Sequence, residues 1–66
     1  MSLKKLFKEL IITESQKSLA EQIPINEKTF SANLTGRSRP TIRNARKYIL
    51  FLERKGIRTS LNEIYE

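Results

Sequence analysis

The residues of this chain most suited to binding chemistry are basic side chains that lie close together in the sequence. No acidic residue stands between Glu27 and Glu53. That interval holds six basic side chains, which are Lys28, Arg37, Arg39, Arg43, Arg46 and Lys47. The other seven of the thirteen basic residues are matched by seven acidic ones, so the whole net charge of +6 comes from this interval. Such a block of one sign is the electrostatic footprint of a polyanionic partner, although a solvated basic surface would share the composition.

The composition lacks several of the residue types that catalysis and metal binding most often use. The chain has no cysteine and no histidine, so it lacks the cysteine nucleophile, the commonest general base and the commonest metal ligands. Glu53, Glu63 and Glu66 have no neighbour that would complete a catalytic pair of carboxylates. A chain of this length buries only about 60% of its unfolded surface, which leaves little room for a catalytic cleft. We therefore expect one domain, residues 1–66, that is not an enzyme and uses no metal, cofactor or small-molecule ligand.

Apolar spacing predicts two helices in the first part of the chain. The first is expected over residues 3–12, with an apolar face made by Leu3, Leu6, Phe7, Leu10 and Ile11. The second begins after Thr13 or Ser15, either of which is suited to be its N-cap. It should stop at Ile23, because Pro24 cannot continue a helix and drives the preceding residue towards an extended conformation.

The next predicted helix is bounded by capping residues. Asn26 can offer its side-chain oxygen to the first free backbone N–H groups, and Gly36 is expected as a left-handed C-cap. Phe30 and Leu34 lie one turn apart on the inward face. Two short helices separated by about three residues have helix-turn-helix geometry, and the motif is placed at about residues 16–35.

The longest predicted helix covers residues 41–55. Its stripe towards the core is expected to consist of Ile42, Ala45, Ile49 and Leu52. The run Tyr48–Leu52 is apolar nearly all round, so either the C-terminal segment 57–66 or a second subunit must cover another face. That segment is expected to form a short helix from Leu61, docked within the chain or on a dimer partner. The residues assigned to dimer or partner contacts are Leu50, Phe51, Leu61, Ile64 and Tyr65.

Several residues in the middle of the chain occur in an order known from one protein family. They are Leu19, Ala20, Ile23, Thr29, Phe30, Ser31, Leu34, Gly36, Arg37 and Pro40. In this order they resemble the Cro/repressor family, the phage lambda repressor-like helix-turn-helix domains. The resemblance implies an all-α, compact bundle of four or five short helices. It also implies a transcriptional regulator that binds double-stranded DNA sequence-specifically, as a small repressor of a phage, plasmid or mobile element. Pro24 stands where the family usually has glycine, so the turn must be built differently.

The second helix of the motif carries the sequence-reading hypothesis. With Phe30 facing inward, steps of about 100° per residue place Lys28 and Ala32 nearly opposite it. Lys28 is suited to guanine O6 and N7, and Ala32 to a thymine methyl group in the major groove. Glu27 either accepts from cytosine N4 or merely complements the helix dipole. The residues expected to read bases are Glu27, Lys28, Thr29, Ser31, Ala32 and Asn33.

The loop after that helix is expected to follow the DNA backbone. Arg37 and Arg39 project guanidinium groups suited to bidentate phosphate binding, and an arginine in a narrow minor groove is the less favoured variant. The resemblance implies that Gln16, at the start of the motif, touches a phosphate, although a plain solvent-exposed glutamine would explain it equally well. The residues assigned to phosphates are Gln16, Lys17, Thr35, Arg37, Ser38, Arg39 and Arg43.

Two other functions share these features. One is a DNA-binding factor in replication or recombination control, and the other is a protein-interaction module whose basic face meets an acidic partner. DNA binding requires Lys28, Ser31 and Arg37 to act from one surface, whereas a partner site would centre on Tyr48–Leu52. That apolar run is far shorter than the ~20 residues of a membrane span, so we expect a cytoplasmic protein without a membrane contact. Like its resembled family, it is expected to be a homodimer, at least on DNA.

Overall fold

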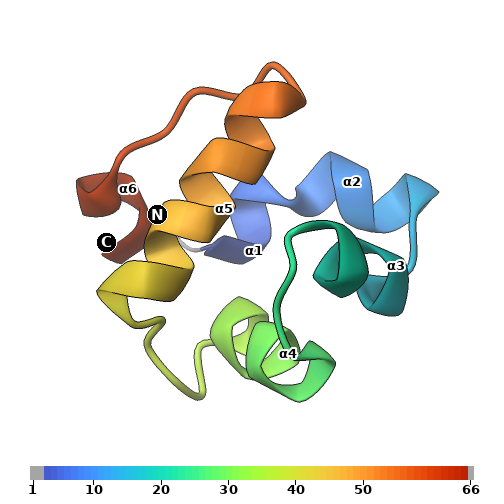
Figure 1. The fold of residues 1–66 in the computed structure, drawn as a ribbon, viewed down its shortest axis with the longest axis horizontal. Coiled ribbons are helices and arrows are strands. Elements are labelled where there is room, and N and C mark those ends of the chain that lie inside the picture. Colours follow the sequence, from blue (N-terminus) through green and yellow to red (C-terminus); the bar gives the residue numbers. More distant parts are fainter. Residues whose placement is uncertain (1–2, 66) are drawn as a thin grey trace.

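Six helices follow one another in residues 3–65, the part of the chain that the computed structural model describes (Figure 1). They are α1 (Leu3–Leu6), α2 (Lys8–Thr13), α3 (Gln16–Gln22), α4 (Glu27–Thr35), α5 (Ile42–Arg54) and α6 (Leu61–Tyr65). No strand occurs among these residues, so the predicted all-α bundle is confirmed. None of the helices in this range combines the length and apolar character that crossing a membrane requires.

The predicted first helix is divided in two at Phe7. Its φ of −93° and ψ of 4° depart from helical values, so α1 ends before it and α2 begins after it. The hydrogen bonds continue across the break, because Phe7 N–H donates to Leu3 O at 3.1 Å and Ile11 N–H donates to Phe7 O at 2.9 Å. The division explains why six helices occur where four or five were expected.

Side-chain caps begin the three central helices. The hydroxyl of Ser15 accepts the N–H of Ser18 at 3.1 Å at the start of α3. Asn26 Oδ1 accepts the N–H groups of Lys28 and Thr29 at 2.9 and 3.2 Å at the start of α4, as the sequence predicts. Thr41 caps α5 in the same way. A cap of this kind stabilises a helix by about 1 kcal/mol, so local sequence sets most of these boundaries.

The turn between α3 and α4 differs from the prediction at Ile23. The expected extended conformation is wrong, because Ile23 has φ −62° and ψ −38° and closes the last turn of α3. Its N–H donates to Leu19 O at 3.0 Å and its side chain is buried, so both the backbone bond and packing hold it there. The Ile23–Pro24 peptide bond is cis. Four residues, 23–26, therefore connect the two helices without a glycine.

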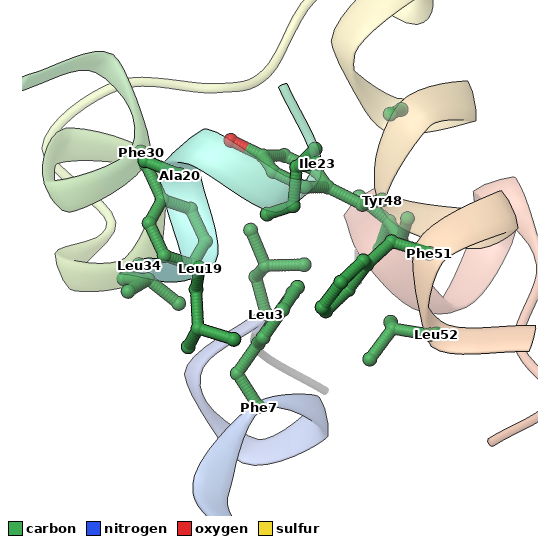
Figure 2. Packing of buried hydrophobic residues seen from close by; sticks show 12 residues of the cluster. Leu3, Phe7, Leu19, Ala20, Ile23, Phe30, Leu34, Tyr48, Phe51 and Leu52 are labelled. Atoms are coloured by element: carbon green, nitrogen blue, oxygen red, sulfur yellow. The ribbon is translucent and has the colours of Figure 1, made fainter. Parts of the chain in front are cut away.

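The core is built around the ring of Phe7 (Figure 2). This ring lies edge-on to Phe30 at 5.2 Å and to Tyr48 at 5.9 Å, and it stacks on Phe51 at 6.1 Å between ring centres. Each such pair contributes about 0.5–1.5 kcal/mol beyond the burial of its area. The buried apolar residues are Leu3, Phe7, Leu19, Ala20, Ile23, Phe30, Leu34, Ala45, Tyr48, Phe51, Leu52 and Ile64.

The inward face of α5 is rotated from the predicted one. Ala45 and Leu52 are buried as expected, but Ile42 is 57% exposed and does not belong to the stripe. Its place is taken by Tyr48 and Phe51, whose rings pack on the centre of the core. The prediction failed because the two aromatic rings bury more area than an isoleucine in the first turn of the helix.

The C-terminal helix α6 packs within the chain, against α5 and α1. Ile64 is 5% exposed and Phe51 is 3% exposed, so their assignment to a dimer or partner contact is wrong. Both side chains are buried in the hydrophobic core of the same chain. Leu61 and Tyr65 are partly buried against that core, whereas Leu50 stays 58% exposed. Of the two alternatives for this segment, docking within the chain is the observed one.

Candidate nucleic-acid interface

A shallow concavity of about 400 Å³ lies on the outward side of α4. It is lined by Lys28, Ser31, Ala32 and Arg37, three of which were predicted to read bases and one to bind phosphate. Lys28 is exposed, and Ser31 and Ala32 are half-buried in its floor. The three residues that DNA binding requires on one surface therefore do share a surface. A floor of two small side chains, one carrying a hydroxyl and one a methyl group, together with two cations in the lining, leaves room for the edge of a base pair or a phosphate.

The guanidinium group of Arg37 is tied to the end of α4. Its Nε–H donates to Thr35 Oγ1 at 3.3 Å. The Thr35 hydroxyl lies 3.0 Å from Ser31 O and 3.3 Å from Ala32 O, so it donates back into the last turn of the helix. Since a guanidinium carries five N–H donors, four of those of Arg37 remain for a ligand. This relay explains how Arg37, in a loop, shares the concavity with Lys28.

Asn33 does not read bases, and its assignment to that group is wrong. It is 5% exposed, its Nδ2 donates to Ser38 O at 3.0 Å, and its Oδ1 accepts the Tyr48 hydroxyl at 2.6 Å. Burial removes water from the Tyr48 hydroxyl and raises its pKa above the ordinary value, so the group stays protonated and donates. Both ends of the Asn33 amide are therefore used inside the domain.

This placement of Asn33 was readable from the sequence. Three steps of about 100° put it only about 60° from Phe30, on the inward face. A buried amide needs partners, and the partners come from residues distant in the chain, Ser38 and Tyr48. The face could have been predicted from periodicity, but the identity of the partners could not.

The loop 36–41 carries the next predicted phosphate contacts. Arg37, Ser38 and Arg39 are all exposed there. Gly36 begins the loop with a φ of 81°, which confirms the predicted left-handed cap. The Ser38 N–H donates to Ala32 O at 3.3 Å, and the Arg39 guanidinium lies 5.8 Å from the centre of the Tyr65 ring. The loop is thus folded back on the domain with its cations outward.

The other predicted site residues lie on neighbouring turns and do not line the concavity. Glu27 is exposed and Thr29 half-buried in the first turn of α4. Gln16 is half-buried and Lys17 exposed in the first turn of α3, while Arg43 is exposed in the first turn of α5. The first turns of helices present free N–H groups and a positive dipole end, which favour an anion.

Two cations of the basic interval were not assigned to the site. The ammonium group of Lys47 donates to Pro24 O at 3.1 Å, so it ties α5 to the turn between α3 and α4. Arg46 is exposed on the same helix. The charge block is therefore not a single surface, and its part around α4 and loop 36–41 is the candidate interface.

Fold and site together define a small all-α domain in which a short turn joins α3 to α4, and α4 with the loop after it presents a basic concavity. Comparisons of the chain with protein-family models, curated proteins and solved structures found no match.

Proposed function

We propose that this chain is a transcriptional regulator that binds duplex DNA sequence-specifically, a small repressor of the kind carried by phages, plasmids and mobile elements. The observation that carries the proposal is the concavity on α4, which gathers Lys28, Ser31, Ala32 and Arg37. The resemblance to the Cro/repressor family supports it, since the residues of that resemblance fall on α3, α4 and the loop after them. Such a regulator acts in the cytoplasm.

The outward face of α4 is suited to direct readout in the major groove. A groove about 12 Å wide admits a helix whose exposed side chains are small apart from one long cation. In this role Lys28 donates to guanine O6 and N7, Ala32 meets a thymine methyl group, and Ser31 donates to or accepts from a base edge. Sequence preference would then come from these three residues.

The loop 36–41 is suited to hold the register of the helix on the duplex. Arg37 and Arg39 offer planar guanidinium groups to phosphates, and such contacts add affinity without specifying sequence. Each neutralised phosphate releases counterions, so binding should weaken steeply as salt rises. No acidic residue lies between Glu27 and Glu53, so Glu27 is the one carboxylate within the segment that forms α4 and this loop.

A homodimer on paired half-sites completes the proposal. Half-sites one helical turn apart lie about 34 Å from centre to centre. The Cα trace of the domain spans 25 Å along its longest axis, so two copies with their side chains fit side by side at that spacing. Leu50, a large apolar side chain exposed on α5, is the contact we assign to the second copy.

The experiment that tests the proposal is the selection of bound duplexes from a random DNA pool. The affinity for the selected duplexes is then measured as a function of salt concentration. An enriched inverted repeat with a steep salt dependence would support specific, symmetric binding. The Lys28→Gln/Arg37→Gln variant should lose binding, whereas Arg54→Gln, at the far end of α5, should retain it. Salt-sensitive binding without enrichment would reduce the site to a non-specific basic surface. No binding at moderate salt would refute the proposal and favour the protein-interaction alternative.

A further inference from the structure

The loop 36–41 is attached to the domain at both ends. At its start, Asn33 Nδ2 donates to Ser38 O at 3.0 Å and the Ser38 N–H donates to Ala32 O at 3.3 Å. At its end, the Tyr65 hydroxyl donates to Pro40 O at 2.8 Å. The first attachment comes from α4 and the second from α6, which is distant in sequence. Residues 38–40, which include Arg39, are thus held between two fixed points.

Tyr65 also touches the side chain of Arg39. The guanidinium carbon lies 5.8 Å from the centre of the Tyr65 ring, within the range of a cation–π contact. Such a contact acts on the charge of the guanidinium group and uses none of its N–H donors in a hydrogen bond. The contact therefore leaves Arg39 able to bind a phosphate in bidentate fashion.

We propose that Tyr65 is a positioning residue for anion binding by Arg39, so that α6 prepares the DNA-facing loop although it need not touch DNA. The proposal rests on the proposed function and deepens it. The Tyr65 hydroxyl fixes the backbone after Arg39 and the ring fixes its side chain. Binding then orders less chain, because part of the entropy of the loop has been lost in folding.

A purely structural role is the competing explanation. Tyr65 is half-buried and packs against the core, so its removal could act only through the docking of α6. Leu61, the first residue of α6, also packs on the core, and its aliphatic side chain can make neither the hydrogen bond to Pro40 O nor the cation–π contact with Arg39. Leu61→Ala therefore weakens α6 while leaving both Tyr65 contacts in place, and it serves as the matched control.

Two substitutions separate the hydroxyl from the ring. Tyr65→Phe removes the bond to Pro40 O and keeps the ring, and Tyr65→Leu removes both. We expect Tyr65→Phe to weaken binding of the selected duplex about two- to tenfold, with little change in Tm, and Tyr65→Leu to weaken it further. The loss should be the same for selected and scrambled duplexes. Once Arg39→Ala is present, Tyr65→Leu should have little further effect on binding, because the pair acts as a unit.

The free protein provides a readout that does not depend on DNA. The ring of Tyr65 should shift the NMR signal of the Arg39 side-chain N–H, and Tyr65→Leu should return it to the position of an exposed arginine. Tyr65 variants that bind as tightly as the wild type would overturn the proposal, and so would losses that follow Tm as they do in Leu61→Ala. A wild-type protein that binds no DNA would refute the proposed function, while the NMR signal would still show whether Tyr65 holds Arg39.

Discussion

The buried pair of Tyr48 and Asn33 offers a sharp test of the packing between α4 and α5. Tyr48→Phe deletes a hydroxyl that donates to Asn33 Oδ1 at 2.6 Å and leaves that oxygen buried without this partner. An unsatisfied buried acceptor costs about 1–3 kcal/mol. With a loss of about 2 kcal/mol, a domain of this size should melt about 8–16 °C lower. Asn33→Leu should cost about the same, because it strands the Tyr48 hydroxyl.

The double variant carries the decisive measurement. Replacing both partners by apolar groups leaves neither end of the Tyr48–Asn33 bond orphaned. Ser38 O also loses the Asn33 donor, but Ser38 is exposed, so Tyr48→Phe/Asn33→Leu should be only about 1 kcal/mol less stable than the wild type. The two single losses should therefore exceed the double loss by about 3 kcal/mol. Urea unfolding of all four proteins measures this difference. Tyr65→Phe is the matched control, since Pro40 is only half-buried and its carbonyl is nearer to water. Additive losses would refute the assignment of a coupled buried pair.

Further expected outcomes concern binding, pH and assembly. Lys28→Gln should weaken the selected duplex about tenfold more than a scrambled one in competition binding, and a uniform loss would make Lys28 a phosphate contact. Arg37→Gln should weaken all duplexes and lower the salt slope by about one, and an unchanged slope would remove Arg37 from the interface. Burial raises the pKa of the Tyr48 hydroxyl above the value of 10.0 that it has in the unfolded chain. The neutral hydroxyl therefore contributes its full stability below pH 10, and this contribution is lost as the pH rises further. In urea unfolding, Tyr48→Phe should lose less stability at alkaline pH than the wild type does. Leu50→Glu should lower self-association in sedimentation, and an unchanged dissociation constant would exclude that surface.

Local signals in the sequence were sufficient for the boundaries of α4, but not for the break at Phe7 or the conformation of Ile23. Asn26 and Gly36 define the two ends of α4 through contacts with residues at most three positions away. The same is true of the hydroxyl caps Ser15 and Thr41. Because these interactions act within one turn of chain, the sequence order contains all the information that they require.

Non-local packing decided what the sequence left open. The spacing of Ile42 suited the predicted stripe on α5, but the observed helix places Tyr48 and Phe51 against Phe7 and leaves Ile42 exposed, while Ile49 packs against the core as expected. A periodic pattern predicts that a helix has an apolar face. It does not predict which large side chains of that helix will fill the core. For the candidate site, the face with Lys28, Ser31 and Ala32 was predictable, because it follows from one inward residue on α4. Its link to Arg37 through Thr35 was not.

The Tyr65 contacts were hidden from the sequence for the same reason. Tyr65 and Pro40 are far apart in the chain, and neither residue type predicts the hydrogen bond between them. The sequence left the apolar edge with Tyr65 either docked within the chain or in contact with a dimer partner, because so short a helix must pack on something. Within residues 3–65 that edge meets α1 and α5 of the same molecule.

The aromatic cluster affects how incomplete chains behave during synthesis. Phe7 lies in the first part of the sequence, but its neighbours Tyr48 and Phe51 lie on α5. A nascent chain that stops short of α5 therefore leaves the rings of Phe7 and Phe30 without their cover. Such fragments are substrates for proteases and chaperones, since they cannot close a core. Only chains that extend through α5 would escape this surveillance, so translation that aborts before α5 should leave no interfering half-domains in the cell.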